Sequence, residues 1–298
     1  MYKIAVISGK GGTGKTFLTS ALTAILKRQI ILDCDVDASN LYLMLNPSDG
    51  IRHEFYGGKT AVIDSERCID CGICTENCRY GAIDENYNVD SFLCEGCSLC
   101  FHLCPVDAVQ MKTLKAGEYY QAETSLGPFV YAEMTPGSEN SGKLVNEIKE
   151  AAGRITRESP VEFMLLDGPP GTSCPLISTV AGCHAAIIVT EPTLSGLHDL
   201  QRVYAVVQKF RTSAGVVINK YDLSPEQTEK IEEYCAQEDL TILGKIPYST
   251  EIAESLSRGE NVFENLSNSI KQEIDSIWER TLVMLHNRRK RTKQYDYA

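Results

Sequence analysis

Short apolar segments alternate with amphipathic ones along most of the chain. Runs of strand length predict β-strands at Lys3–Ser8, Gln29–Asp33, Phe163–Asp167, Ala185–Thr190, Gly215–Ile218 and Leu240–Leu243. Apolar residues at helical spacing predict helices at Lys15–Lys27, from Asn140 or Ser141 to about Ala152, at Ser195–Phe210, at Ser224–Gln237 and twice more near the C-terminus. Such alternation is typical of an α/β fold with a doubly wound, mostly parallel sheet.

The alternation stops between Cys68 and Cys104, where no helical period is found and cysteine dominates. Eight of the twelve cysteines fall in this segment, which is an internal repeat whose halves start 26 residues apart, at Cys68 and Cys94. We therefore expect residues 1–58 and 114–298 to form the sheet domain, with its C-terminal helices. Residues 59–113 should form a small inserted domain.

Composition narrows the classes of partner. The formal net charge of −11 argues against general affinity for nucleic acid, because neutralising phosphates needs a basic face. No apolar run approaches the roughly 18–20 residues of a membrane span, and Met1–Ser8 lacks the features of a secretory signal, so we expect a cytoplasmic protein without a membrane partner. The basic run Arg288–Lys293 could contact a membrane surface or an acidic partner, but charged termini of this kind are usually solvated.

A phosphate-binding loop follows the first predicted strand. Gly9–Thr16 fits G-x-x-x-x-G-K-[ST] and precedes a predicted helix, which is the context that this motif requires. Backbone N–H groups of such a loop converge on phosphate oxygens; we expect Lys15 to contact the β- and γ-phosphates and Thr16 to bind Mg²⁺. The expected ligands are ATP or ADP with Mg²⁺. The residues expected to bind nucleotide here are Gly11, Gly12, Thr13, Gly14, Lys15 and Thr16.

The cysteines form two copies of C-x2-C-x2-C-x3-C, and proline follows the second copy but not the first, where Arg79 stands. This is the spacing that holds [4Fe-4S] clusters in bacterial ferredoxins, with the fourth cysteine of each run bound to the other cluster. Zinc also binds four cysteines, but usually through C-x2-C pairs separated by longer spacers. Gly72, Gly81 and Gly96 suit the tight turns around a cluster. We expect one cluster on Cys68, Cys71, Cys74 and Cys104, and a second on Cys94, Cys97, Cys100 and Cys78.

The loop has a further lysine at its second position. The string from Lys10 to Thr16, KGGTGKT, resembles the deviant Walker A loop of the MinD/ParA/Mrp class of ATPases, which includes the nitrogenase iron protein. The resemblance implies that Lys10 reaches across a dimer interface to the nucleotide of the partner. The alternative is a solvated loop lysine.

Two acidic segments extend the resemblance. Leu32–Leu41 is similar to the second acidic motif of this class, which implies that Asp35 is a catalytic residue that orients the attacking water and also contributes to the Mg²⁺ site, and that Asp33 is structural. Asp37 departs from the usual small or apolar residue. Asp167, followed by GPPGT, resembles the Walker B aspartate and switch II, which implies that it holds Mg²⁺ through water.

Two later loops match the base-contacting positions of the class. Asn219 and Lys220 resemble its adenine-contacting motif, and Pro247 and Tyr248 resemble its second base-contacting loop. Together with the cysteine runs, these motifs identify the chain as similar to MinD-superfamily ATPases with an inserted ferredoxin domain. Genes of that group often neighbour small proteins related to dinitrogenase iron–molybdenum cofactor-binding domains.

Four cysteines lie outside the repeat. Cys174 follows Asp167 by seven residues, and in the nitrogenase iron protein a cysteine at the matching offset helps to hold a cluster between subunits. The resemblance implies a third metal or transfer site at Cys174; the alternative is a buried residue that packs beside Pro175. We expect packing roles for Cys34, Cys183 and Cys235. The five histidines are scattered, and no histidine site is indicated.

Three functions fit these motifs. The first is a slow, partner-stimulated Mg-dependent ATPase whose nucleotide-driven dimer closure gates electron transfer from two clusters to a partner metalloprotein. The second is a carrier or assembly ATPase for iron–sulfur or other metal cofactors, and the third is a positioning ATPase of the MinD/ParA type. In each case the resemblance implies a nucleotide-dependent homodimer, or a heterodimer with a related ATPase.

Overall fold

The computed structural model describes residues 1–138, 140–252, 254 and 262–295. Its strands are β1 (Tyr2–Ser8), β2 (Gln29–Asp33), β3 (Ile51–Ile63), β4 (Val109–Thr124), β5 (Gly127–Met134), β6 (Phe163–Pro170), β7 (Ala185–Thr190), β8 (Ser213–Asn219) and β9 (Thr241–Ile246). Its helices are α1 (Lys15–Ile25), α2 (Leu41–Leu45), α3 (Ile73–Glu76), α4 (Leu99–Leu103), α5 (Ser141–Glu158), α6 (Cys174–Val180), α7 (Leu194–Lys209), α8 (Pro225–Gln237) and α10 (Asn268–Tyr295), with short 3₁₀ turns at Tyr221–Leu223 and Val262–Asn265.

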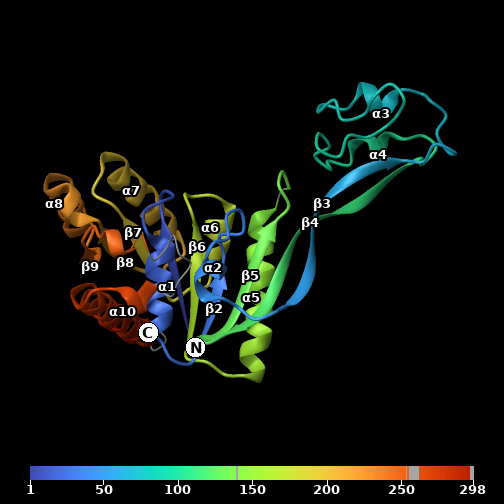
Figure 1. The fold of residues 1–298 in the computed structure, drawn as a ribbon. Coiled ribbons are helices and arrows are strands. Elements are labelled where there is room, and N and C mark those ends of the chain that lie inside the picture. The colour runs from blue at the N-terminus through green and yellow to red at the C-terminus, as the bar shows by residue number, and fades with distance from the viewer. Residues whose placement is uncertain (139, 253, 255–261, 296–298) are drawn as a thin grey trace. The chain divides into compact units, whose positions relative to one another are not determined.

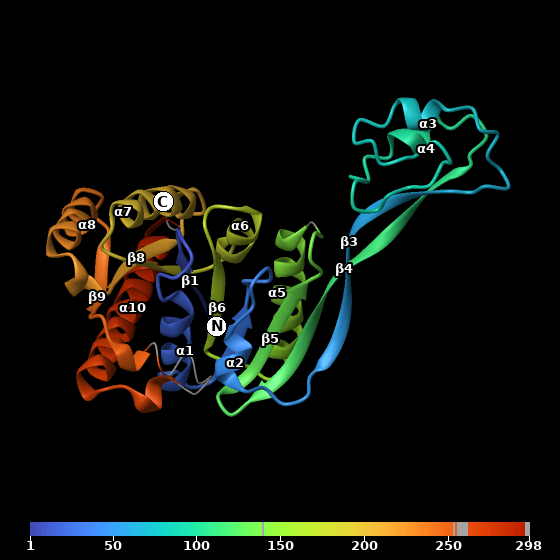
Figure 2. The same cartoon turned by 45° about the horizontal axis from the view of Figure 1, so that its top comes forward.

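The strands form one sheet in the order β3-β4-β5-β2-β6-β1-β7-β8-β9. From β5 to β9 every neighbouring pair is parallel, so the predicted doubly wound, mostly parallel fold is confirmed. The central strands β1 and β2 are almost entirely buried, since helices cover both faces of the sheet. The two views in Figures 1 and 2 show helices on either side of these strands.

Alternate residues of the central strands point to different helix layers. Ile4 and Val6 of β1 belong to one buried cluster with Phe17 of α1 and Ile274 of α10. Their neighbours Ala5 and Ile7 are also fully buried but lie outside that cluster. Helices α1 and α10 therefore cover one face of the sheet, where they contact each other, and the contacts of α6 and α7 with β6 and β7 fall on the other (Figure 2).

The predicted strands and helices of this unit are confirmed, with ends that differ by one to a few residues; the largest difference is α5, which continues to Glu158. Of the two predicted terminal helices, the long one is α10, and the segment before it includes residues outside the described part. The sequence analysis did not predict β3, β4, β5, α2 or α6. In β3 and β4 exposed and buried residues mix without a regular alternation, so neither strand has the apolar run that identifies the central ones.

The chain divides into two compact units. The first comprises residues 1–52, 119–133 and 142–298, and the second comprises residues 53–118 and 134–141. The second unit contains both cysteine runs, with the short helices α3 and α4 and the first part of β4. Gly72, Gly81 and Gly96 all have positive φ angles of 60° to 77°, as tight turns require.

The face of α10 that lies against the sheet should contribute strongly to the stability of the first unit. Ile274 is fully buried, whereas Val283 on the same helix is 60% exposed. We expect Ile274→Ala to lower the free energy of unfolding by about 2–5 kcal/mol, because the cavity that it leaves is closed in by packed neighbours. Val283→Ala is the control and should change it by less than about 0.5 kcal/mol.

Trp278 is the only tryptophan and packs edge-on against Phe163, so its fluorescence during urea unfolding reports on this unit. Equal effects of the two substitutions would contradict the packing described here.

Candidate functional site

The loops that follow the parallel strands meet at one edge of the sheet. The phosphate loop follows β1, and the acidic segment that begins with Cys34 follows β2. Asp167 lies within β6 and is paired in register with Asp33, while Glu191 and Lys220 directly follow β7 and β8. Because the carboxyl ends of parallel strands share an edge, the fold collects these polar residues in the place where open α/β sheets bind ligands.

Glycine at position 14 allows the phosphate loop to close. Gly14 has φ of 90°, which other residues rarely adopt, and a Cβ there would collide with the side-chain amide of Asn219. That amide donates to the carbonyl of Thr13 at 2.8 Å. Asn219, for which the resemblance implies a contact with the adenine, therefore contacts the phosphate loop directly. Gly11 and Gly12 form the exposed tip of the loop.

Lys15 lies at the start of α1, almost completely buried among carboxylates. Its Nζ is 3.3 Å from Asp167 Oδ2 and 3.7 Å from Asp35 Oδ2. Burial lowers the pKa of Lys15, but the charges of Asp167, Asp35 and Asp33 outweigh burial and raise the pKa above its usual value. Thr16 donates to Asp167 Oδ2 at 2.9 Å. The structure thus brings together Lys15, Thr16, Asp35 and Asp167.

Asp33 shapes the acidic segment. Its fully buried carboxylate accepts hydrogen bonds from the amides of Asp35 and Leu41 and from the Ser39 hydroxyl, at 2.7–3.2 Å. Burial, followed by the neighbouring charge of Asp167, raises the pKa of Asp33 to about 7, although the Ser39 hydrogen bond and Lys15 oppose the shift. These bonds fix the turn that presents Asp35, in agreement with a structural role for Asp33.

Asp35 is more accessible than Asp33 and points to Lys15. Burial is the main reason that its pKa is raised to about 6, and the charge of Lys15 opposes that shift. Asp37, two residues later, is exposed. A carboxylate with a pKa near 6 is ionised at neutral pH and can accept a hydrogen bond from water, which is the chemistry that the resemblance implies for Asp35.

Thr19 also contacts Asp167 and was not identified from the sequence. Its buried hydroxyl donates to Asp167 Oδ1 at 2.7 Å, so the two oxygens of this carboxylate have separate donors on α1. Thr19 is one helical turn after Lys15, but a threonine on a helix carries no motif of its own. The contact becomes visible only when α1 is seen packed against β6 in the structure.

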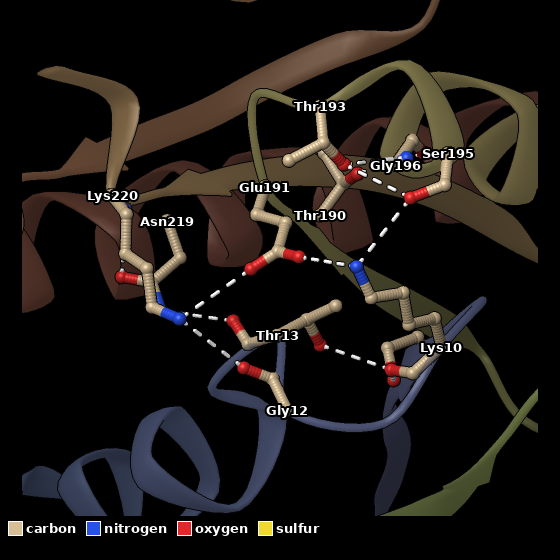
Figure 3. Close-up of polar contacts among 11 residues, drawn as sticks. Lys10, Gly12, Thr13, Thr190, Glu191, Thr193, Ser195, Gly196, Asn219 and Lys220 are labelled. Atoms are coloured by element: carbon tan, nitrogen blue, oxygen red, sulfur yellow. Dashed lines mark hydrogen bonds and ion pairs between the residues drawn. The ribbon is translucent and has the colours of Figure 1, made fainter. Parts of the chain in front are cut away.

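Lys10 is bound to its own chain. Its Nζ lies 2.6 Å from Glu191 Oε1 and 3.4 Å from the Ser195 hydroxyl. Figure 3 shows Lys10 between these two residues. Lys220 Nζ is 3.4 Å from the other oxygen of Glu191 and 3.4 Å from the Gly12 carbonyl. Partial burial raises the pKa of Glu191, but the hydrogen bond from Lys10 and the charges of Lys220 and Lys10 hold it below its usual range. The sequence motifs gave no indication of Glu191.

Pro247 and Tyr248 follow β9 at the same edge of the sheet. Pro247 is half-buried and Tyr248 is 49% exposed. The Tyr248 amide donates to Asp222 at 2.7 Å, so this loop is anchored to the turn that follows Lys220. The two loops that the resemblance assigns to the base are thereby linked to each other.

The second unit contains two cavities that are lined by cysteines. One is lined by Cys78, Cys94, Cys97 and Cys100, and the other by Cys68, Cys71 and Cys104; Cys74 borders both. Three cysteines of one run thus meet the last cysteine of the other run, together with apolar residues that include Ile83 and Ile63. Thiolates in a largely apolar surrounding are the donor set that iron–sulfur clusters require, so the residues present fit such clusters.

Hydrogen bonds reach several of the sulfurs. Partial burial raises the pKa of Cys104, but backbone amides of Val106, Ala108 and Val109 outweigh burial and lower it below the ordinary value. At Cys94, desolvation is likewise outweighed by the Ala61 amide and the Thr60 hydroxyl, and its pKa is also lowered. Donors of this kind stabilise the thiolate, which is the form that binds metal.

Within the described residues, no group of three or more histidine, cysteine, aspartate or glutamate side chains is placed to hold a single metal ion. That finding concerns one ion at one point, whereas the four thiolates around a four-iron cluster bind four different irons.

In the same part of the chain, no helix has the length and apolar character needed to cross a membrane. The side chains of Arg288–Lys293, in the last part of α10, lie outside the described residues.

The predicted packing roles of three isolated cysteines are confirmed. Cys34, Cys183 and Cys235 are 0–2% exposed, and burial raises the pKa of Cys34 and of Cys235, the latter to about 12. Cys174 is different. It is exposed at the start of α6, directly before the buried Pro175, and it lies beside Gly142 at the start of α5.

Comparison with known sequences gives a match to the CobQ/CobB/MinD/ParA nucleotide binding domain over residues 4–262. The chain is 35% identical over 221 residues to an uncharacterized protein of Methanocaldococcus jannaschii, covering 73% of this chain and 78% of that one. It is 25% identical to the iron-sulfur cluster carrier protein of Pyrococcus abyssi, covering 87% and 78%.

A shorter match concerns 53 residues, 18% of the chain, that are 40% identical to the pyruvate synthase subunit PorD of Methanothermobacter marburgensis and cover 65% of it. This match supports the inserted ferredoxin-like module. Among solved structures, the septum site-determining protein MinD of Pyrococcus horikoshii, in complex with Mg-ADP, has a TM-score of 0.56 at 19% identity, covering 94% of this chain and 95% of that one. At this identity the likeness shows the fold.

The pKa of Asp35 leads to a prediction for the nucleotide-free protein. Because this pKa is about 6 in the folded state and about 4 in an unfolded chain, the folded protein holds an extra proton between these values and loses stability as the pH rises through 6. Asp35→Asn removes the charge, so we expect the variant to be about 1–2 kcal/mol more stable than the wild type at pH 8.

Thermal unfolding of the nucleotide-free protein at pH 8 and near pH 4 would measure this effect. Near pH 4 the difference should shrink to about 0.4 kcal/mol, because the carboxyl of Asp35 is then protonated in the folded state and about half protonated in the unfolded chain. Asp37→Asn is the matched control: it removes an exposed carboxylate two residues away and should have little effect at either pH. A loss of stability in Asp35→Asn at pH 8 would contradict the prediction.

Proposed function

Because the chain belongs to the CobQ/CobB/MinD/ParA nucleotide-binding family, we propose that it is an ATPase that carries two [4Fe-4S] clusters and assists the assembly of metal cofactors on a partner protein. The observation that carries this proposal is the union, in one chain, of a phosphate-loop site with two cavities that are each lined by at least four cysteines. Similarity to an iron-sulfur cluster carrier protein over 87% of the chain supports the assembly role.

In the nucleotide site, different residues of the chain would bind the phosphates, hold Mg²⁺, orient water and border the base. Lys15 would bind the β- and γ-phosphates through the ammonium that now faces Asp167 and Asp35. The Thr16 hydroxyl and Asp167 would hold Mg²⁺, which supplies charge stabilisation to the transferred phosphoryl group. Asp35 would orient the attacking water. Asn219, Lys220 and Pro247 would border the adenine, and Gly11, Gly12, Thr13 and Gly14 would surround the phosphates.

In the second unit, we assign one cluster to Cys68, Cys71, Cys74 and Cys104 and the other to Cys94, Cys97, Cys100 and Cys78. The lining of the two cavities supports this division, although Cys74 also borders the second cavity. The clusters would supply one-electron chemistry. The apolar lining and the hydrogen bonds to Cys94 and Cys104 would limit access of water and stabilise the thiolates.

A second candidate is nucleotide-gated electron transfer to a partner metalloprotein. It is favoured by the arrangement of the cysteines, because each proposed cluster has ligands from two separate runs. All of these iron–thiolate bonds would have to break before the cluster could be delivered. On this reading the clusters are permanent. On the assembly reading, a delivered cluster would involve a more accessible thiol, and Cys174 is exposed beside the loop that follows Asp167.

The protein partners are part of the proposal. We infer a nucleotide-dependent dimer, formed with a second copy or with a related ATPase, in which Lys10 contacts the nucleotide of the partner subunit. Lys10 would first have to leave Glu191, to which it is bound in this structure. The acceptor would be a metalloprotein or a cofactor-binding protein.

The ligand assignment can be tested by substitution. Cys104→Ser should remove one cluster, so that the iron and acid-labile sulfide of anaerobically purified protein fall by about half. Cys235→Ser is the control, because Cys235 is a buried cysteine of the first unit and should leave the iron content unchanged. Zinc in place of iron, or equal iron in both variants, would contradict the assignment.

The assembly role can be tested with protein that carries ⁵⁵Fe-labelled clusters. Incubated with the cluster-free form of a [4Fe-4S] dehydratase, it should pass ⁵⁵Fe to the acceptor faster with MgATP than without, and restore the acceptor's activity. Lys15→Ala should abolish the nucleotide effect, because the phosphates lose their buried cation. Cys174→Ala tests whether delivery uses the exposed thiol.

The two candidate functions give different results in this experiment. If all ⁵⁵Fe stays with the protein while MgATP changes the EPR spectrum or midpoint potential of the reduced clusters, the assembly role is wrong and nucleotide-gated electron transfer is supported. If neither the iron nor the spectrum responds to MgATP, both proposals fail.

A further inference from the structure

Glu191 occupies a position that no motif explains. It directly follows β7, its side chain is 13% exposed, and its two oxygens face two different lysines. Lys10, from the phosphate loop, lies 2.6 Å from Oε1, and Lys220, from the loop after β8, lies 3.4 Å from Oε2. Figure 3 shows the carboxylate between the two ammonium groups.

The segment that carries Glu191 is held by its own hydrogen bonds. Thr193 caps α7 by accepting from the Gly196 amide at 2.9 Å, and Thr190 donates to the Gly196 carbonyl at 3.0 Å. A Cβ at Gly196 would collide with the backbone carbonyl of Glu191, so the first turn of α7 packs directly against that residue. The carboxylate is therefore presented by a fixed turn.

Both lysines flank the place where phosphates would bind. Lys10 is part of the phosphate loop, and Lys220 donates to the carbonyl of Gly12 at the tip of the same loop. The third cation of the site, Lys15, faces Asp35 and Asp167, which have roles of their own in the proposed hydrolysis. Glu191 has no such role, yet it neutralises two cations that an incoming polyphosphate would otherwise attract.

We propose that Glu191 is an internal competitor of the nucleotide phosphates, a positioning residue that pairs with Lys10 and Lys220 and releases Lys10 when the nucleotide binds. In the nucleotide-free state the carboxylate keeps Lys10 folded onto its own chain. When a triphosphate enters the loop, its added negative charge draws Lys10 away from Glu191, which frees Lys10 for the contact across the dimer interface that the proposed function assigns to it. Lys220 remains as the partner that keeps the partly buried carboxylate from being left alone. Glu191 thereby sets how tightly nucleotide binds.

The competition predicts that one substitution lowers the thermal stability of the protein without nucleotide but raises its affinity for MgATP. Glu191→Gln keeps the shape of the side chain but removes its charge. Without nucleotide the variant loses an ion pair and should unfold at a lower temperature than the wild type. When nucleotide binds to the variant, Lys10 no longer has to be released from a carboxylate, so we expect the Kd for MgATP to fall about tenfold, which corresponds to about 1.4 kcal/mol.

The test measures MgATP and MgADP binding to the full-length, cluster-loaded protein by calorimetry. Glu226→Gln is the matched control, since Glu226 forms a comparable 2.7 Å ion pair with Lys230 on the exposed face of α8. Its affinity for MgATP should equal that of the wild type. The increase in MgATP affinity caused by Glu191→Gln is then measured again in a Lys10→Met background. There the increase should be smaller, because Lys10 is no longer present to be released.

Two results would overturn the proposal. One is unchanged or weaker MgATP binding by Glu191→Gln, and the other is a gain that persists undiminished in the Lys10→Met background. If Glu191→Gln does not fold, Glu191→Asp takes its place: it keeps the charge but is one methylene too short to bridge both lysines as Glu191 does. The shorter carboxylate should tighten MgATP binding by a smaller factor, and unchanged affinity would count against the proposal.

Discussion

The buried ion pair between Lys15 and Asp167 is the interaction on which the nucleotide site depends. It joins the first residue of α1 to the strand β6, at the point where β6 lies in register with β1 and β2. Asp167 is held at the same time by Thr16 and Thr19, so both of its oxygens are occupied by α1. Because a buried charge is costly without partners, this arrangement locks the phosphate loop to the centre of the sheet.

The acidic segment is fixed at both of its ends. At the start, Asp33 accepts three hydrogen bonds and sets the turn that carries Asp35. At the far end, Tyr42 of α2 stacks on Tyr131 of β5, and Tyr131 also stacks on Tyr120 of β4. The short helix α2, which alone would be unstable, is therefore held by aromatic packing. The position of Asp35 follows from this packing as much as from its own sequence.

Much of this site could be predicted from the sequence, and the reason is that its motifs are local. The loop Gly9–Thr16 and the apolar strands on either side of it are recognisable because neighbouring residues carry the signal. The contact of Thr19 with Asp167 could not be predicted, since it joins residues 148 positions apart. Glu191 was missed for the same reason, because a glutamate after an apolar strand looks like any strand end until Lys10 and Lys220 are seen beside it.

The cysteine runs show where this local signal ends. Their spacing predicts which cysteines share a cluster, and the two cavities have linings that agree with it, but spacing alone could not show that Cys74 borders both. Nor did the runs reveal that Thr60 and Ala61 of β3 donate to Cys94, because β3 has no strand pattern of its own. The spacing of the cysteines is thus a local signal for the proposed ligands, whereas the strands that position them give no such signal in the sequence.

The lysines and carboxylates of the nucleotide site pair with one another, and a charged ligand could replace these pairings. Lys10, Lys15 and Lys220 face Glu191, Asp35 and Asp167, and burial already raises the pKa of Asp35 to about 6. Each pairing satisfies a charge that would be costly alone, but none uses the backbone amides of the phosphate loop. A magnesium-bound polyphosphate offers the lysines phosphate oxygens and offers the carboxylates a cation. The site is therefore built from pairs that a nucleotide could exchange, because the residues that pair with one another here are the ones proposed to bind the ligand.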